Sequence, residues 1–197
     1  SIKLGATMMV RQLQSAVLVH DGQVLDVFGT GRYRLAAETM PNTAMRHGWT
    51  GEGPSLFSFD IFYLNMKPFT DIGWASVSPI TVEDPELGVV KLKATGKFSF
   101  KVADPEKLMT YIYATNQIYD TAYLVGQLRS LLSAGLADVW NEAGSVQPES
   151  PELLEQLSEN TENRLHARFK QMGLELFTFI IEEIQYPESI QSRLNVR

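Results

Sequence analysis

Apolar and polar positions follow two different periods along this chain. Between residues 10 and 102, apolar side chains recur at every second position or gather in short runs, which is typical of β-strands. Between residues 104 and 173 they recur at every third and fourth position, which is typical of amphipathic helices. Residues 174–184 return to a strand pattern. The sequence therefore predicts a sheet, then helices, then one late strand that rejoins the sheet.

The stretch Val10–Leu35 predicts a β-hairpin, a sharp bend and a third strand. Its apolar runs Ala16–Val19 and Val24–Phe28 are joined by an Asp-Gly step, and Gly22 can adopt the positive φ that a tight turn needs. A Gly-Thr-Gly corner at residues 29–31 then marks the bend.

Further strands are predicted before residue 102. Leu56–Met66 is apolar on both alternating sets, which is typical of a central strand covered on both faces, and Thr70–Val77 predicts a shorter strand. Residues 38–54, rich in Pro, Gly, Asn and Thr, predict a long loop, and residues 84–86 (Asp-Pro-Glu) predict a turn.

The longest predicted strand, Val89–Val102, has the most regular alternation. We expect an antiparallel strand with one buried and one wet face, in which Gly96 indicates a bulge or a bend. The apolar face consists of Val90, Leu92, Ala94, Phe98, Phe100 and Val102, and the polar face of Lys91, Lys93, Thr95, Lys97, Ser99 and Lys101.

Three helices are predicted in the second half, each opened by a capping residue. Asp104 and Ser150 each precede a proline, and Asp120 opens the helix between them, while Gly173 ends the third. A last strand, Leu174–Ile184, is apolar on both faces, and a polar tail follows it. The apolar stripes of the helices lie at Leu108, Met109 and Ile112, at Val125, Leu128, Leu132, Leu136, Val139 and Trp140, and at Leu154, Leu157, Leu165, Phe169 and Met172.

These elements predict an α+β fold, with a mostly antiparallel, twisted sheet from the first half plus the late strand, and three helices packed on it. No repeat or low-complexity segment divides the 197 residues, so we expect residues 1–197 to form a single domain. Because the chain starts with Ser1 rather than Met, we expect it to be excised from a longer protein.

Composition excludes several functional classes. The net charge of −6 comes from 23 acidic and 17 basic residues scattered along the chain, whereas a nucleic-acid binder would show a basic stripe. The absence of cysteine excludes disulfides, cysteine zinc sites and thiol nucleophiles. No apolar run reaches the roughly 18 to 20 residues that span a bilayer.

The ionisable residues do not form a recognisable active site. His20, His47 and His166 lack the spacing of a metal site. Glu182 and Glu183 are adjacent on a strand and point to opposite faces, so they cannot converge on a substrate.

Two further patterns have simple structural explanations. Asp84 and Glu86 flank a proline in a turn that we expect to be exposed, where acids are common. The glycine corner at residues 29–31 lacks the lysine and the helix start of a phosphate-binding loop. We therefore predict no catalytic, cofactor-binding or metal-binding residues.

Three surface features leave alternatives open. The lysines of the Val89–Val102 strand either face anionic lipid headgroups or belong to a solvated face with acidic partners on neighbouring strands, and we favour the second reading. The third helix either pairs with another subunit or, as we favour, packs on its own sheet. The aromatic residues Trp49, Phe57 and Phe69 either form a contact patch or cover the sheet edge.

A family resemblance covers nearly the whole chain in order. The segments that carry it are Val10–Arg11, Gln14–Val17, Asp26–Gly29, Gly31, Leu35, Tyr63–Asn65, Phe69–Trp74, Asp84–Ala94, Gly96, Val102–Pro105, Gly173–Leu176 and Ile184–Pro187. In these segments the sequence resembles the SPFH domain of stomatin, prohibitin and flotillin, also called band 7, and within it a bacterial branch labelled virion-core-protein-like. It departs from the family at residues 11–14 (Arg-Gln-Leu-Gln), where the family commonly has Arg-Glu-Ser-Gln, and at Thr30, where the family commonly has proline.

The resemblance implies a non-catalytic, oligomerising scaffold domain that organises other proteins at a membrane. It implies a cytoplasmic position, peripheral to the inner face of the membrane, with the membrane contact made by regions outside this chain. Its expected partners are copies of itself and other proteins, without nucleic acid or a cofactor. A soluble module that binds a partner by sheet-edge or loop contacts is the alternative, and an enzyme with an unrecognised site is a third.

Overall fold

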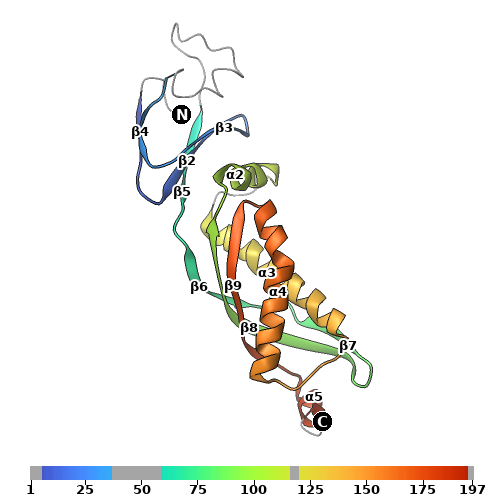
Figure 1. Ribbon diagram of the computed structural model, residues 1–197. Helices are drawn as coiled ribbons and strands as arrows, with labels where there is room; N and C mark the ends of the chain where they lie inside the picture. The colour runs from blue at the N-terminus through green and yellow to red at the C-terminus, as the bar shows by residue number, and fades with distance from the viewer. Residues whose placement is uncertain (1–5, 37–58, 116–119, 195–197) are drawn as a thin grey trace. The chain divides into compact units, whose positions relative to one another are not determined.

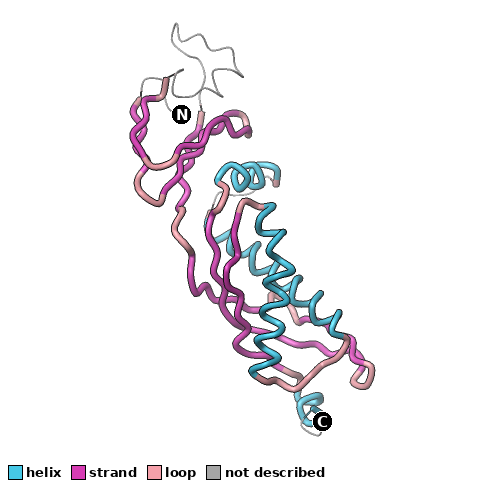
Figure 2. The backbone as a smooth tube through the Cα atoms, viewed as in Figure 1, coloured by secondary structure: helices cyan, strands magenta, loops and turns pink. Residues whose placement is uncertain are grey.

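The computed structural model describes residues 6–36, 59–115 and 120–194, which form nine strands and four helices (Figures 1 and 2). The strands pair in antiparallel sheets, so the predicted α+β class is confirmed. The chain divides into two compact units. Unit 1 comprises Ser1–Pro68, Lys101–Gln117 and Gln171–Leu174, and unit 2 comprises Phe69–Phe100, Ile118–Lys170 and Glu175–Arg197.

Unit 1 contains a two-stranded and a three-stranded sheet. β1 (Thr7–Val10) pairs with β4 (Gly31–Arg34), and β2 (Gln14–His20) lies between β3 (Gln23–Phe28) and β5 (Asp60–Asn65).

The predicted hairpin is confirmed as β2 and β3. Its turn residues Asp21 and Gly22 have φ angles of 47° and 75°, which suits the right-handed twist of a two-residue hairpin. The strand after the glycine corner is confirmed as β4, and its partner β1 was not predicted because that pairing joins distant segments.

The central strand of the three-stranded sheet is β2, whose residues Ala16–Val19 are buried. Ala16 and Leu18 pack into one apolar cluster with β1 and β3, while Val17 and Val19 pack against Met109 on the other face. The run is uniformly apolar because both faces of this strand are covered.

The prediction of a central strand at Leu56–Met66 is wrong. β5 pairs only with β2 among the described residues, and Tyr63 is 50% exposed. β5 is apolar on both alternating sets although it is not a central strand. One reason is that Phe62 packs edge-on against Tyr113 of α2, with ring centroids 6.0 Å apart. Residues 56–58 and the loop predicted at 38–54 lie outside the described residues.

Helix α2 (Pro105–Ala114) begins as predicted. The Asp104 carboxylate accepts the backbone N–H of Lys107 at 3.0 Å, and Leu108 and Met109 are buried.

Unit 2 is built on β8 (Gly88–Val102). β6 (Phe69–Ala75) and β7 (Ile80–Asp84) pair with successive stretches of β8, and β9 (Leu174–Gln185) also pairs with it. The alternation predicted for this strand and the late strand that rejoins the sheet are both confirmed. The buried apolar side chains of β8 are Val90, Leu92, Ala94, Phe98, Phe100 and Val102. Ser99, predicted on the wet face, is buried as well, and its hydroxyl accepts the backbone N–H of Asp71 on the neighbouring strand β6.

Gly96 lies where two strands approach closely. It pairs in regular register with Trp74 of β6, and the register shift of this pair falls elsewhere, between Phe69 and Ile72. A Cβ at position 96 would overlap the carbonyl oxygen of Ile180 in β9. A residue without a side chain is therefore required here.

Helices α3 (Thr121–Ala143) and α4 (Pro151–Gln171) cover one face of the unit-2 sheet (Figure 1). Asp120 and Ser150 cap them as predicted, by accepting the N–H groups of Ala122 at 3.0 Å and Leu153 at 3.2 Å. Trp74 lies under α3, where its indole N–H donates to the carbonyl of Arg129 and its ring packs edge-on against Phe179. The reading that the third helix packs on its own sheet is confirmed by the buried residues Leu157, Leu165 and Phe169.

The C-terminal part differs from its sequence pattern in two respects. The strand predicted at Leu174–Ile184 is present as β9 and is apolar on both faces, but it is buried on one face only, since Ile180 is 50% exposed. The expected polar tail contains a fourth helix, α5 (Glu188–Leu194), in which Ile190 and Gln191 donate to the carbonyl of Pro187. Leu194 is the single buried residue of this helix, so the helix has too few apolar positions for the sequence to predict it.

Candidate interaction surfaces

The face of the unit-2 sheet opposite the helices carries the predicted row of lysines. Lys91, Lys93 and Lys97 are exposed and Lys101 is half-buried. Lys97 Nζ lies 2.9 Å from Glu182 Oε1 of β9, and each side chain is 48% exposed. The expected acidic partner on a neighbouring strand is therefore present for Lys97.

The electrostatics of this pair favour the charged form of Lys97. Hydrogen bonding and charge from Glu182, with a smaller contribution from Asp71, raise the pKa of Lys97 above its ordinary value. Because both side chains are solvent-screened, the pair contributes little to stability. It cancels one positive charge in the lysine row, which weakens attraction to an anionic surface.

The predicted aromatic patch is only partly within the described residues. Phe69 stacks on Phe100 of β8 with ring centroids 5.0 Å apart. This contact agrees with the reading that the aromatic side chain covers the sheet rather than forming a contact patch. Trp49 and Phe57 lie outside the described residues.

The histidines are not brought together. His20 is the last residue of β2, and its Nε2 lies 3.4 Å from the carboxylate of Asp21 in the hairpin turn. His166 is exposed on α4, and His47 lies outside the described residues. Within residues 6–36, 59–115 and 120–194, no group of three His, Asp or Glu side chains could hold a metal ion.

Asp84 corrects the expectation of an exposed acidic turn, because it is only 4% exposed. One carboxylate oxygen accepts the backbone N–H groups of Glu86 and Leu87, each at 2.8 Å, and the other accepts that of Val146, also at 2.8 Å. The Asp-Pro-Glu pattern predicted the turn, but nothing local to it indicated a partner 62 residues away. Asp84 is thus a structural anchor.

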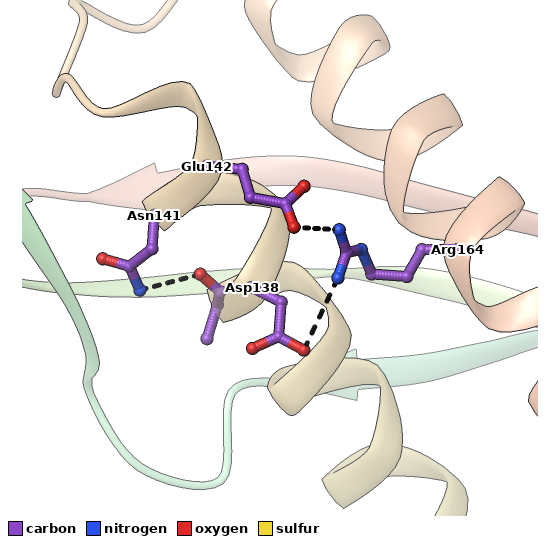
Figure 3. Close-up of polar contacts among 5 residues, drawn as sticks. Asp138, Asn141, Glu142 and Arg164 are labelled. Atoms are coloured by element: carbon purple, nitrogen blue, oxygen red, sulfur yellow. Dashed lines mark hydrogen bonds and ion pairs between the residues drawn. The ribbon is translucent and has the colours of Figure 1, made fainter.

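A cleft of about 760 Å³ lies between the C-terminal part of α3 and the N-terminal part of α4. Its floor includes Trp140 and Leu157, and Arg164 lies on its rim. The guanidinium of Arg164 contacts the carboxylates of Glu142 and Asp138, the latter at 3.9 Å (Figure 3). Because two carboxylates neutralise this arginine, the cleft does not present its charge to an anionic ligand.

Tyr186 links the segment after β9 to the segment between α3 and α4, because its hydroxyl donates to the carbonyl of Gln147 at 2.9 Å. Burial, and then the charge of Glu149, raise the pKa of this phenol above its ordinary value. The folded state therefore retains the proton when the unfolded state loses it. This contribution to stability is complete below about pH 10 and declines as the pH rises further.

We expect Tyr186→Phe to lower the free energy of unfolding by about 1 kcal/mol at neutral pH, because it removes one hydrogen bond. Above about pH 10 the wild type loses the phenol's contribution and the variant does not, so the difference between them should shrink. Urea unfolding of both proteins at several pH values measures this. A difference that stays constant from neutral to alkaline pH would contradict the assignment.

No helix within the described residues is long and apolar enough to cross a bilayer. The structure defines an α+β fold with antiparallel sheets. In unit 2, helices cover one face of the sheet and charged side chains lie on the other.

The chain belongs to the SPFH domain-Band 7 family, whose model matches residues 1–197. The predicted family is thereby confirmed, while the virion-core-like branch stays a prediction. A relative in Bacillus subtilis (strain 168), an uncharacterized protein called YdjI, is 24% identical over 199 residues, which cover 98% of this chain and 60% of YdjI. The chain thus spans less than two thirds of this curated relative.

Membership of the family indicates a membrane-associated scaffold or a protein-interaction role in general. Domains of this family generally oligomerise and interact with proteins, and the family is generally non-enzymatic.

Proposed function

We propose that this chain is the non-catalytic, oligomerising scaffold domain of a bacterial protein that organises other proteins at the cytoplasmic face of a membrane. The observation that carries the proposal is the family model, which matches the whole chain. We further propose that units 1 and 2 act together as a single SPFH domain, that its partners are copies of itself and other proteins, and that it has no catalytic residues.

Two features of unit 2 support a binding role over a chemical one. The sheet face opposite the helices offers charged side chains of both signs, such as Lys91, Lys93 and Glu182, which suit reversible contacts between proteins. The arginine that lines the cleft between α3 and α4 is neutralised by carboxylates, so the cleft lacks an unpaired positive charge that could stabilise an anionic reaction intermediate.

The proposal is tested by light scattering after size-exclusion chromatography across a wide range of protein concentration. The measurement is made on this chain and on the protein as the cell makes it. We expect the full protein to form large, discrete oligomers. If both remain monomeric at every concentration, the scaffold function is overturned and a soluble partner-binding module replaces it.

The membrane contact is tested separately by co-sedimentation with vesicles of anionic and of zwitterionic lipid. Because we assign this contact to regions outside the chain, we expect the full protein to sediment with vesicles and this chain to remain in solution. Binding of the chain to anionic vesicles that is lost in Lys91→Ala/Lys93→Ala would instead assign the contact to the lysine row.

A further inference from the structure

The unit-2 sheet has two edges, one formed by β9 and the other by β6 and β7. An edge strand exposes N–H and C=O groups that can pair with a strand of another chain, and proteins usually block such edges. In unit 2, side chains of the covering helices occupy both edges.

Backbone N–H groups at the edge of β9 donate to two side chains of α4 and to the side chain of Glu149, which precedes the N-cap residue Ser150. Glu162 accepts the N–H of Phe179 at 3.1 Å, and Ser158 accepts the N–H of Ile181 at 2.9 Å. Ile184 donates in the same way to Glu149, at 2.7 Å.

The spacing of these contacts follows from helix and strand geometry. Ser158 and Glu162 are four residues apart on one face of a helix, which is about 6 Å along its axis. Phe179 and Ile181 are two residues apart on one side of a strand, which is about 6.6 Å. Because these two spacings match, side chains one helical turn apart can accept the two consecutive N–H groups that point outward from the edge of β9.

The opposite edge, formed by β6 and β7, is bonded by α3. Arg129 Nε donates to the carbonyl of Gly73 in β6 at 3.0 Å. Ser133 accepts the N–H of Val77, in the segment that joins β6 to β7, at 3.3 Å. Asn141 of α3 donates to the carbonyl of Thr81 at 3.1 Å and accepts the N–H of Glu83 at 3.4 Å. Its amide nitrogen also donates to the carbonyl of Ala137 within α3, at 2.9 Å. Toward the sheet edge the amide thus presents one donor and one acceptor, as a residue of an added strand would.

We propose that α3 and α4 act as guards that stop a strand from a second copy of this chain from adding to the unit-2 sheet. Along β9, an added strand would also cover a groove of about 350 Å³ whose lining includes Leu154 and the exposed Ile180. The apolar strip favours addition, and the side-chain bonds oppose it. Self-association then proceeds through other surfaces.

The test uses the guard variant Ser158→Ala/Glu162→Ala, which removes the two side chains of α4 that accept N–H groups of β9. Its matched control is Glu155→Ala/Glu159→Ala, which removes carboxylates from the same groove and helix without touching these bonds to β9. We expect amide hydrogen exchange at Phe179 and Ile181 to accelerate at least tenfold in the guard variant alone. We also expect only this variant to form concentration-dependent species with intermolecular β-structure in infrared spectra.

A rescue variant separates guarding from ordinary helix packing. Adding Ile180→Lys to the guard variant places a charge on the unguarded edge, which opposes strand pairing without restoring any bond. We expect it to return the mass to that of the wild type while exchange at Phe179 and Ile181 stays fast.

A folded guard variant that exchanges quickly but keeps the wild-type mass at every concentration overturns the proposal. If the guard variant does not fold, Asn141→Ala at the other edge is measured in the same assays, with exchange read at Glu83, and the same two outcomes decide. The proposal is independent of the scaffold function, because each variant is compared with the wild type whatever its oligomeric state.

Discussion

Replacing Gly96 with alanine should lower the free energy of unfolding by about 3 kcal/mol or more, or prevent folding. The added Cβ would overlap the backbone of β9 at Ile180, and backbone in the middle of a sheet cannot move aside as a side chain can. Urea unfolding followed by circular dichroism measures the loss. In an ordinary strand the same substitution stabilises, because glycine loses more conformational freedom on folding.

Gly73→Ala in β6 is the matched control. No atom outside its chain neighbours lies within 4 Å of a Cβ built there, and its φ is not positive. We expect this variant to be as stable as the wild type or more stable, by about 0.5 kcal/mol. If the alanine variants at 96 and 73 have equal stability, the close approach of β8 and β9 is wrong.

Replacing Asp84 with alanine should cost about 3 to 5 kcal/mol, because three backbone N–H groups lose a shared acceptor. The N–H of Val146 is the most affected, since Val146 is fully buried. Asp84→Asn keeps one acceptor oxygen but turns an amide NH₂ toward one of the donors, so we expect an intermediate loss. Thermal unfolding of both variants measures the order.

The control for Asp84 is Glu83→Ala, which removes an exposed carboxylate from the preceding position. We expect a change within about 0.5 kcal/mol, as is usual for surface sites. An equal loss in the variants at 83 and 84 would show that net charge, rather than the three hydrogen bonds, determines the effect.

The features predicted well from sequence are those that depend on residues a few positions apart. Gly22 in its turn and the caps Asp104, Asp120 and Ser150 each act on neighbouring backbone. The alternation of β8 was equally clear, because one covered face and one open face impose a period of two on consecutive residues.

The features that were missed depend on contacts between distant segments. β5 is as apolar as a central strand, yet the pattern cannot show that its partner is β2 alone among the described residues. Asp84 is read as exposed unless Val146 is known to lie against it. Asn141 and Ser158 resemble ordinary polar positions of a helix, and only the fold places them at sheet edges.

Sequence reasoning on the functional surfaces succeeded at the level of family and chemistry. The ordered segments from Val10 to Pro187 identified the family, and the wet face of β8 predicted an acidic partner for its lysines, found as Glu182. It could not specify which strand provides that partner, because the pairing of β8 with β9 joins segments that lie far apart in the sequence.

The two buried indole rings of unit 2 give that unit its own optical signal. Trp74 and Trp140 are the described tryptophans, and the third, Trp49, lies outside the described residues. In a Trp49→Phe protein, fluorescence emission would follow unit 2 alone, whereas far-ultraviolet dichroism follows both units. Coincident denaturation curves from the two signals would establish that the units melt as one cooperative body, and separated curves would establish that each has a stability of its own.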